Sequence, residues 1–291
     1  MKAAPFAYHR PDTVPGALSL LAELGDDAKI LAGGQSLVPM LAMRLTHFDN
    51  LIDISRIGEL CDIERRGDTV RIAAGTPHAL VGLDDEVAEA VPLLTLSTPH
   101  IGHFQIRTRG TLGGAIAHAD PAAEYAAVAL TLDAEIEATS VRGTRRIPAA
   151  EFFTGLWETA LAADEILTAV TFPVWSGRVG FSVHEFARRH GDFAIAGATV
   201  AVELDDDDTV ARCGIGLLGM GSTPQRGTPA ERALIGRPVT DVTAEEVGRL
   251  AVSVLEDIPA DLQGSADYRR KVGATMAARA WLEATTEARR A

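Results

Sequence analysis

Hydrophobic positions in the first 57 residues alternate between a strand-like and a helix-like period. Three short apolar runs predict strands, over 6–9, 29–32 and 51–54. Two stretches with apolar residues at helical spacing predict helices between them, over 17–24 and 37–45. Thr13 or Asp12 is expected to cap the first helix, Gly25 to end it, and Ser36 to cap the second. This order of elements predicts a small βαβ-type unit.

The pattern loses this alternation from about residue 58 to residue 175. Strand-like segments occur over 69–74, 134–140 and 166–172. A helical stretch over 86–96 contains Pro92 as an expected interruption. A second helix is expected to run through Leu132, with Asp120 and Pro121 at its N-cap and first turn. Together these elements predict an α+β region.

The last third of the chain places strands before helices. Strands are expected over 181–188, 198–204 and 212–218, and the acidic run 205–208 reads as a solvated turn between two of them. Helices are expected over 243–255 and 268–284, the first with Thr243 as N-cap and Glu246 as its capping-box partner. The pattern predicts an antiparallel sheet with helices on one face. We therefore expect three domains, over 1–57, 58–175 and 176–291.

Composition narrows the function classes. The chain has 291 residues, 47% of them hydrophobic, and no apolar run approaches the roughly 20 residues of a bilayer span. Without a signal-peptide core, a cytoplasmic location is expected. The net charge of −13 and the lack of a basic face disfavour nucleic-acid binding. Cys61 and Cys213 are read as small buried hydrophobes, too few to ligate an iron–sulfur cluster.

Two glycine-rich segments carry most of the chemical signal. The first loop, AGGQS over 32–36, lies between a predicted strand and a predicted helix, and the second loop, RGTLGGA over 109–115, precedes HADP. Adjacent glycines allow sharp turns and close approach of a ligand to backbone amides, and a helix N-terminus favours a phosphate. Two such loops could hold a pyrophosphate from both sides. A valine at Gly33, Gly34, Gly113 or Gly114 is then expected to displace the ligand and leave the fold largely intact.

Other motifs for nucleotides, metals and catalysis are missing. Neither loop is a Walker A motif or a Gly-x-Gly-x-x-Gly fingerprint, so the residues alone indicate at most a dinucleotide binder without a Rossmann fold. His100 and His103 lack an evident third ligand, so no metal site is predicted. No residue stands out as a catalytic acid, base or nucleophile. Trp157, Trp175 and Trp281 are expected in core or interface packing.

Several collinear segments resemble one known family. AGGQSLVPMLAMRL over 32–45, IGHFQIRTRGT over 101–111 and RGTLGGAIAHADPAAE over 109–124 resemble the FAD subunits of the xanthine oxidase, or molybdenum hydroxylase, family. EILTAVTFP over 165–173, FARRHGDFAIAGA over 186–198 and SADYRRKVGATMAARA over 265–280 continue the resemblance over nearly the whole chain, nearest to the carbon monoxide dehydrogenase medium-subunit type. The resemblance implies a vanillyl-alcohol-oxidase (PCMH-type) FAD-binding fold of two N-terminal α/β subdomains, followed by a C-terminal flavoprotein domain of antiparallel sheet and helices.

The resemblance also assigns cofactor-binding positions residue by residue. The implied FAD contacts are Lys29, Ile30, Leu31, Ala32, Gly33, Gly34, Gln35, Ser36, Leu37, Ile101, Thr111, Gly113, Gly114, Ala115, His118, Asp120, Glu124, Leu167, His184 and Phe193. His118 has a structural hydrogen bond as its alternative role, and Leu167 is expected to use its backbone. Ala115 stands where the family often has Asn or Ser, and Phe193 where it often has Tyr, so each position loses a polar contact.

By this resemblance, the chain is an electron-transfer subunit. A large subunit would hold the molybdopterin cofactor, and a small ferredoxin-like subunit with [2Fe–2S] clusters would pass electrons through FAD in this chain to an external acceptor. We expect a dimer of heterotrimers, with a peripheral position at the inner face of the membrane as one option. Two alternatives stay open: a free-standing FAD-dependent oxidase or dehydrogenase, and a cofactor-free assembly subunit.

Overall fold

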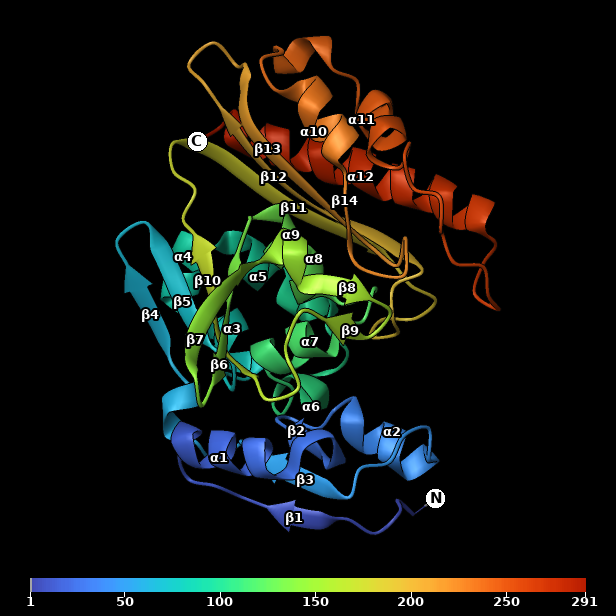
Figure 1. Ribbon diagram of the computed structural model, residues 1–291. Coiled ribbons are helices and arrows are strands. Elements are labelled where there is room, and N and C mark those ends of the chain that lie inside the picture. The colour runs from blue at the N-terminus through green and yellow to red at the C-terminus, as the bar shows by residue number, and fades with distance from the viewer. Residues whose placement is uncertain (1) are drawn as a thin grey trace.

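A computed structural model describes residues 2–291 (Figure 1). Three sheets follow one another along the molecule, with the N-terminal segment at one end and the C-terminal helices at the other. A small two-stranded hairpin is attached to the middle part. Within the described residues, no helix is long and apolar enough to cross a membrane. The architecture is α+β, as predicted.

The first sheet confirms the predicted βαβ-type unit. Its three parallel strands have the order β1 (Ala7–His9), β3 (Asn50–Asp53) and β2 (Ala28–Leu31). The connecting helices are α1 (Val14–Leu24) and α2 (Leu37–Met43). Thr13 caps α1 by accepting from the Gly16 amide at 3.2 Å, as expected. The prediction that Ser36 caps α2 is wrong, because its side chain makes no capping bond.

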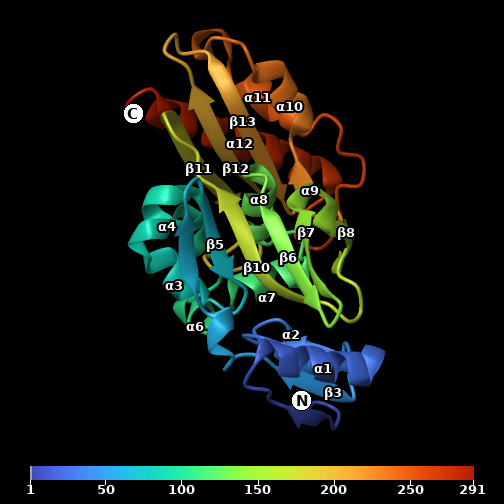
Figure 2. The same ribbon diagram turned by 60° about the vertical axis from the view of Figure 1, so that its left-hand side comes forward.

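The second sheet is antiparallel and has five strands. Their order is β4 (Ile63–Arg66), β5 (Thr69–Ala73), β10 (Ile166–Pro173), β6 (Glu135–Ser140) and β7 (Gly143–Pro148). Figure 2 shows β5, β10 and β6 side by side. The two edge strands were not predicted from the sequence, because they are mostly polar and largely exposed.

Short helices pack against the second sheet. They are α3 (His78–Leu83), α4 (Asp85–Ala90), α5 (Pro92–Ser97), α6 (Phe104–Arg107), α7 (Leu112–His118), α8 (Glu124–Thr131) and α9 (Ala149–Phe152). The interruption at Pro92 is confirmed, since it begins a separate helix. The predicted helix start at Asp120 and Pro121 is wrong. Asp120 instead closes a turn by accepting from the Ala122 amide at 2.9 Å, and α8 begins at Glu124.

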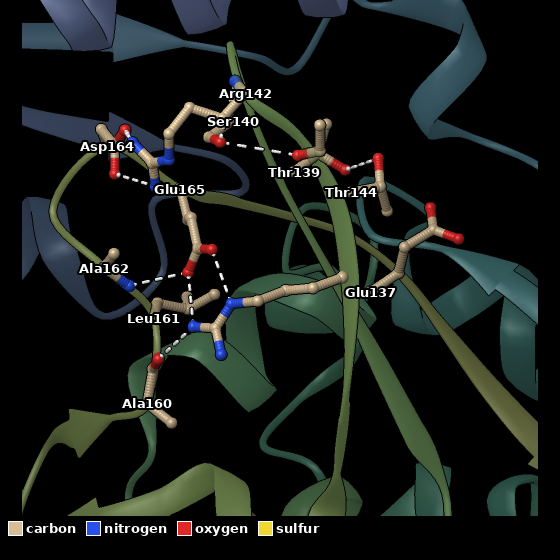
Figure 3. Close-up of polar contacts among 12 residues, drawn as sticks. Glu137, Thr139, Ser140, Arg142, Thr144, Ala160, Leu161, Ala162, Asp164 and Glu165 are labelled. Atoms are coloured by element: carbon tan, nitrogen blue, oxygen red, sulfur yellow. Dashed lines mark hydrogen bonds and ion pairs between the residues drawn. The ribbon is translucent and has the colours of Figure 1, made fainter.

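A hairpin of β8 (Phe153–Gly155) and β9 (Glu158–Thr159) leads back to β10. The link between β9 and β10 is fixed by ion pairs to the β6–β7 hairpin (Figure 3). Arg145 contacts Glu165 at 2.7 Å, and Glu165 also accepts from the Ala162 amide at 2.8 Å. Arg142 pairs with Asp164. These bonds hold both the hairpin and the start of β10 in place.

The third sheet is antiparallel, as predicted. Its strands have the order β11 (Arg178–Phe186), β12 (Ala196–Leu204), β13 (Val210–Leu218) and β14 (Gln225–Arg226). The helices that follow are α10 (Thr228–Leu234), α11 (Ala244–Ala251) and α12 (Ala266–Ala288), and the 3₁₀ turns of the chain are Gly25–Asp27, Gly58–Leu60, Thr98–His100 and Val239–Asp241. Thr243 caps α11 as expected, but Glu246 pairs with Arg237 at 2.8 Å instead of closing the capping box.

The helices that follow this sheet pack on one face of it, as predicted, and α8 from the middle of the chain covers the other face, which was not predicted. On one face a Cβ at Gly180 would overlap the carbonyl of Ala284 in α12, and on the other a Cβ at Gly214 would overlap the carbonyl of Thr131 in α8. Every residue of β12 except Glu203 is buried. The third sheet therefore belongs to two hydrophobic cores.

One side-chain expectation is also corrected. Cys213 is buried as expected, whereas Cys61 is exposed. Trp175 and Trp281 are buried, whereas Trp157 is 55% exposed, so interface packing stays its predicted role.

Candidate functional site

The first loop leaves β2 and enters α2 with its amides free. Among the hydrogen bonds of residues 2–291, the backbone N–H groups of residues 33–37 have no partner. The carbonyls of the same loop are used to brace it. Gln35 Nε2 donates to the Gly33 carbonyl at 3.0 Å, and the Val38 amide donates to the Gly34 carbonyl at 3.0 Å. The loop thus offers a run of five donors, a set that suits an anion such as a diphosphate.

The two glycine loops lie against one another. A Cβ on Gly33 would overlap the carbonyl oxygen of Arg109, and a Cβ on Gly114 would lie 3.6 Å from that of Ala32. Gly34 has a φ of +71°, which L side chains rarely adopt. The structure therefore brings together two segments about 80 residues apart in sequence, as the sequence led us to expect.

The second loop uses its amides within the protein. Four consecutive N–H groups donate to protein acceptors: Leu112 to the Thr76 carbonyl at 3.0 Å, Gly113 to the Ala74 carbonyl at 2.9 Å, Gly114 to Thr111 Oγ1 at 3.0 Å, and Ala115 to the Thr111 carbonyl at 3.0 Å. The glycines lie inside α7, whose N-cap is Thr111, and not before it. The expectation that this loop grips a diphosphate with free amides is therefore wrong for residues 112–115.

The four glycines also cannot accept valine without cost to the fold. A Cβ at Gly113 would overlap Ala74, just as one at Gly33 would overlap the backbone of Arg109. A Cβ at Gly114 would lie 2.7 Å from Thr111 Oγ1, and one at Gly34 would lie 3.0 Å from the side chain of Val38. The prediction that a valine leaves the fold largely intact is wrong for Gly33 and Gly113, because the new Cβ would overlap backbone atoms, and it stays a prediction for Gly34 and Gly114.

Charge and aromatic contacts join the two loops beyond the glycines. Burial lowers the pKa of His118, the charge of Asp120 raises it, and the charge of Lys29 lowers it further. Trp157 stacks on His118 with ring centroids 6.3 Å apart, and its Nε1 donates to Asp120 at 3.4 Å. Trp157 holds a φ of +56°, a strained conformation for a bulky residue.

Comparison with known proteins identifies the family. Residues 4–175 match the model of the FAD-binding domain in molybdopterin dehydrogenase, and residues 181–284 match the CO dehydrogenase flavoprotein C-terminal domain. The chain belongs to the FAD-binding medium subunits of the molybdenum hydroxylases.

Relatives and solved structures agree with this membership. The 6-hydroxypseudooxynicotine dehydrogenase complex subunit alpha of Paenarthrobacter nicotinovorans is 40% identical over 99% of this chain and 97% of its own length. The carbon monoxide dehydrogenase medium chain of Hydrogenophaga pseudoflava is 35% identical over 94% of this chain and 95% of its own. A solved carbon monoxide dehydrogenase from Hydrogenophaga pseudoflava, which lacks the Mo-pyranopterin moiety, superimposes with a TM-score of 0.95, at 35% identity and 99% coverage of both chains.

The residues of this medium subunit fit a flavin dinucleotide at the two loops. Five free amides and Lys29 offer hydrogen bonds and positive charge to a diphosphate. The glycines of both loops let their backbones approach one another, so the first loop rests on the second. The first loop is therefore the donor surface, and the second is its support.

One residue of this support could not be recognised from the sequence. His78 donates its backbone N–H to the Gly110 carbonyl at 2.9 Å, and its ring stands edge-on to Tyr125 at 5.1 Å. Burial lowers the pKa of His78 to about 4, so its imidazole is neutral at physiological pH. A lone histidine in a polar–apolar segment carries no sequence signal for this role.

The predicted flavin contacts in the middle of the chain present backbone and apolar surface. Leu167 is buried at the start of β10, next to a β-bulge. Ile101 is partly buried against the core, and its carbonyl accepts from Arg107 at 3.1 Å. On the other side, Ile30 and Leu31 on β2 and Leu37 on α2 are also partly buried.

The remaining predicted contacts lie toward the third sheet. Glu124 begins α8, and burial together with the charge of Glu185 raises its pKa to about 8. Phe193 is 63% exposed in the loop between β11 and β12, where it lines a cavity of about 700 Å³ with Arg188, Arg189, Gly191, Asp192 and Gln263. His184 is not brought to this group. Its Nε2 lies 2.8 Å from Glu283 in α12, on the opposite face of β11 from Glu185.

No group of three or more His, Cys, Asp or Glu residues within the described part of the chain is placed to hold a metal ion.

Proposed function

We propose that this medium subunit binds FAD with its diphosphate on the first loop and relays electrons through it. A small subunit would deliver single electrons from [2Fe–2S] clusters, and an external acceptor would take them from the flavin. A large subunit with the molybdopterin cofactor would oxidise the substrate. The names of the relatives support this division, since they include a "complex subunit" and carbon monoxide dehydrogenase "medium chain" proteins.

One observation carries the cofactor part of the proposal: the run of five unpartnered amides over 33–37. Unpaired backbone donors in a folded chain are rare unless water or a ligand satisfies them. Here they are consecutive, and the loop rests on a second loop whose amides over 112–115 are already bonded within the protein. A diphosphate satisfies such a set better than scattered waters, since donors to ionised oxygens are the stronger ones.

The other predicted contacts would hold the rest of the dinucleotide. The flavin would supply the two-electron redox chemistry, and the protein would orient it. In this role, Leu167 and Ile101 exclude water with their apolar side chains, and His118, Asp120 and Glu124 provide polar contacts. Phe193 can stack but donates no hydrogen bond.

Larger assembly features belong to the same proposal. We infer a dimer of heterotrimers, a cytoplasmic location with peripheral contact to the inner face of the membrane through the complex, and three domains over 1–57, 58–175 and 176–291. Each of these ranges contains one of the three sheets, which supports the division.

Deleting one amide tests the carrying observation. Gln35 lies in the turn closed by the bond from Val38 to Gly34, before α2 begins at Leu37, and its N–H makes no bond within the described residues that proline would remove. Gln35→Pro removes one N–H and the side chain, while Gln35→Ala removes the side chain alone. We expect Gln35→Pro to bind FAD at least about tenfold more weakly than Gln35→Ala, the loss of one charge-assisted bond.

The measurement is FAD titration of the flavin-free chain, followed by the visible absorbance of the flavin. Circular dichroism and the thermal midpoint establish that both variants fold. If both variants fold and bind FAD equally tightly, the free amides of residues 33–37 do not bind the diphosphate. A wild-type chain that takes up no FAD, alone or in its complex, would remove the flavin relay altogether and favour an assembly role.

A further inference from the structure

Glu185 is a buried carboxyl without a partner. It lies on the face of β11 that is turned toward the second sheet and its helices, and its side chain is only 5% exposed. Within the described residues, Glu185 Oε2 is buried and accepts no hydrogen bond. The nearest charged group is His100, whose Nδ1 lies 3.8 Å away, too far for a hydrogen bond. An ionised carboxylate in this position would be strongly destabilised.

Glu124 lies in the same part of the molecule: the next residue, Tyr125, bonds through its hydroxyl to Thr98 at 2.6 Å, in the 3₁₀ turn that also contains His100. Burial raises the pKa of Glu185 to about 7. Burial also raises the pKa of Glu124 to about 8, and the charges of Glu185 and Asp120 raise it further. Two carboxyls that repel one another in this way do not both ionise at neutral pH. The pair therefore holds at least one proton in the resting protein.

Histidines connect this pair to the surface. Burial lowers the pKa of His100, and the charges of His190 and His184 lower it further. His190 is exposed and stacks on His103 with ring centroids 6.0 Å apart. The remaining carboxylate, Glu283 of α12, is bonded to His184 on the other face of β11. The side chain of His100 is 35% exposed, so His100 connects the buried Glu185 to solvent.

We propose that Glu185 is the proton-delivery residue of this subunit, taking protons from solvent through His100 and passing them to Glu124. This inference rests on the proposed function. Full reduction of FAD takes up two electrons and two protons, and iron–sulfur clusters supply electrons alone. Glu124 gives its O–H proton to the cofactor side and receives one from Glu185. Glu185 then recovers a proton from the imidazolium of His100, which solvent reprotonates.

Glu185→Gln tests this role because the amide has the same shape and cannot carry the proton. In the assembled complex, we expect flavin reduction by substrate in a single turnover to slow by about 100-fold. Glu185→Asp should recover much of the rate. The surface change Glu89→Gln, which removes the same charge from a side chain that is 78% exposed, is the matched control and should leave the rate unchanged.

A second readout separates proton delivery from a structural role. In wild type, the flavin midpoint potential plotted against pH should change slope near pH 7, and Glu185→Gln should lose this break. A Glu185→Gln complex with a full complement of flavin and a wild-type rate and slope would overturn the inference while the proposed function stands. Loss of bound flavin with an unchanged slope would show a structural residue and overturn it as well. A wild-type complex without flavin would overturn the proposed function itself.

Discussion

The two glycine loops look alike in sequence and differ in what their backbones do. The first keeps five consecutive amides free, whereas the second donates four consecutive amides to protein acceptors. The second loop's glycines serve close packing: Gly113 lies against Ala74, and Gly110 against the ring of His78. Glycine density therefore marks close approach of a backbone, and only the hydrogen-bond inventory tells whether the neighbour is a ligand or the protein itself.

The largest expected effect separates packing from binding at the second loop. Gly113→Ala should lower the free energy of unfolding by about 3 kcal/mol, because the new Cβ overlaps Ala74 within the core. Urea denaturation of the flavin-free chain measures it. Gly58→Ala, where a Cβ meets open space, is the control and should be nearly neutral. A stable Gly113→Ala variant that has only lost FAD affinity would mean that the second loop is a ligand surface after all.

A smaller effect tests whether Glu124, which follows the second loop, keeps its proton in the folded chain at neutral pH. The folded pKa of Glu124 lies near 8, above that of an unfolded glutamate, so its contribution is complete at low pH and is lost as pH rises toward 8. The flavin-free chain should thus lose stability from about pH 5 to pH 8. Glu124→Gln should remove part of this loss and be more stable than wild type by about 2 kcal/mol at pH 8.

Thermal midpoints of both proteins across this pH range measure the difference. Equal pH dependence would show that Glu124 ionises normally in the folded chain.

A still smaller effect concerns the charge beside the first loop. Lys29→Gln should weaken FAD binding by about fivefold at low salt, and the difference should shrink as salt is added, because Lys29 is exposed. Titration at two ionic strengths measures both effects. Lys271→Gln, an exposed lysine on α12, is the matched control. If the two variants bind FAD alike, the charge of Lys29 plays no part in binding.

The smallest expected effect concerns Trp157, which contacts His118 and Asp120 just after the second loop. Trp157→Phe should raise the FAD dissociation rate by about threefold, because part of the stacking surface on His118 and the bond to Asp120 are lost. In wild type, FAD should quench the long-wavelength emission of this exposed indole. An emission component that is unaffected by FAD would place Trp157 away from the bound cofactor.

Sequence periodicity predicted the elements with strong apolar patterns and missed those without them. The parallel unit around β3, the break at Pro92 and the long helix α12 follow from spacing and proline chemistry. Strands β4 and β7 are largely polar, so no pattern could reveal them. The helix on the second face of the third sheet was missed, because a strand that is buried on both faces is a continuous apolar run, and such a run does not show what covers each face.

The sequence predicted which two loops form the site, but it did not show which of their backbone amides are free to donate. Motif matching found the adjacency of residues 32–36 and 109–115, because glycines record close approach. It could not tell that Thr111, Ala74 and Thr76 already occupy the second loop's amides, since those bonds depend on tertiary structure. It also assigned His184, whereas strand alternation turns the neighbouring Glu185 toward Glu124.

A sheet that serves two cores restricts how its sequence can vary. A larger side chain on β12 pushes α12 away on one side or α8 on the other, so a change there succeeds only with a compensating change in a helix. Two residues past the strand, the turn at Asp206 and Asp207 is exposed and free of this coupling. In a saturation-mutagenesis library, β12 should therefore tolerate the fewest substitutions, and the adjoining turn at Asp206 and Asp207 the most.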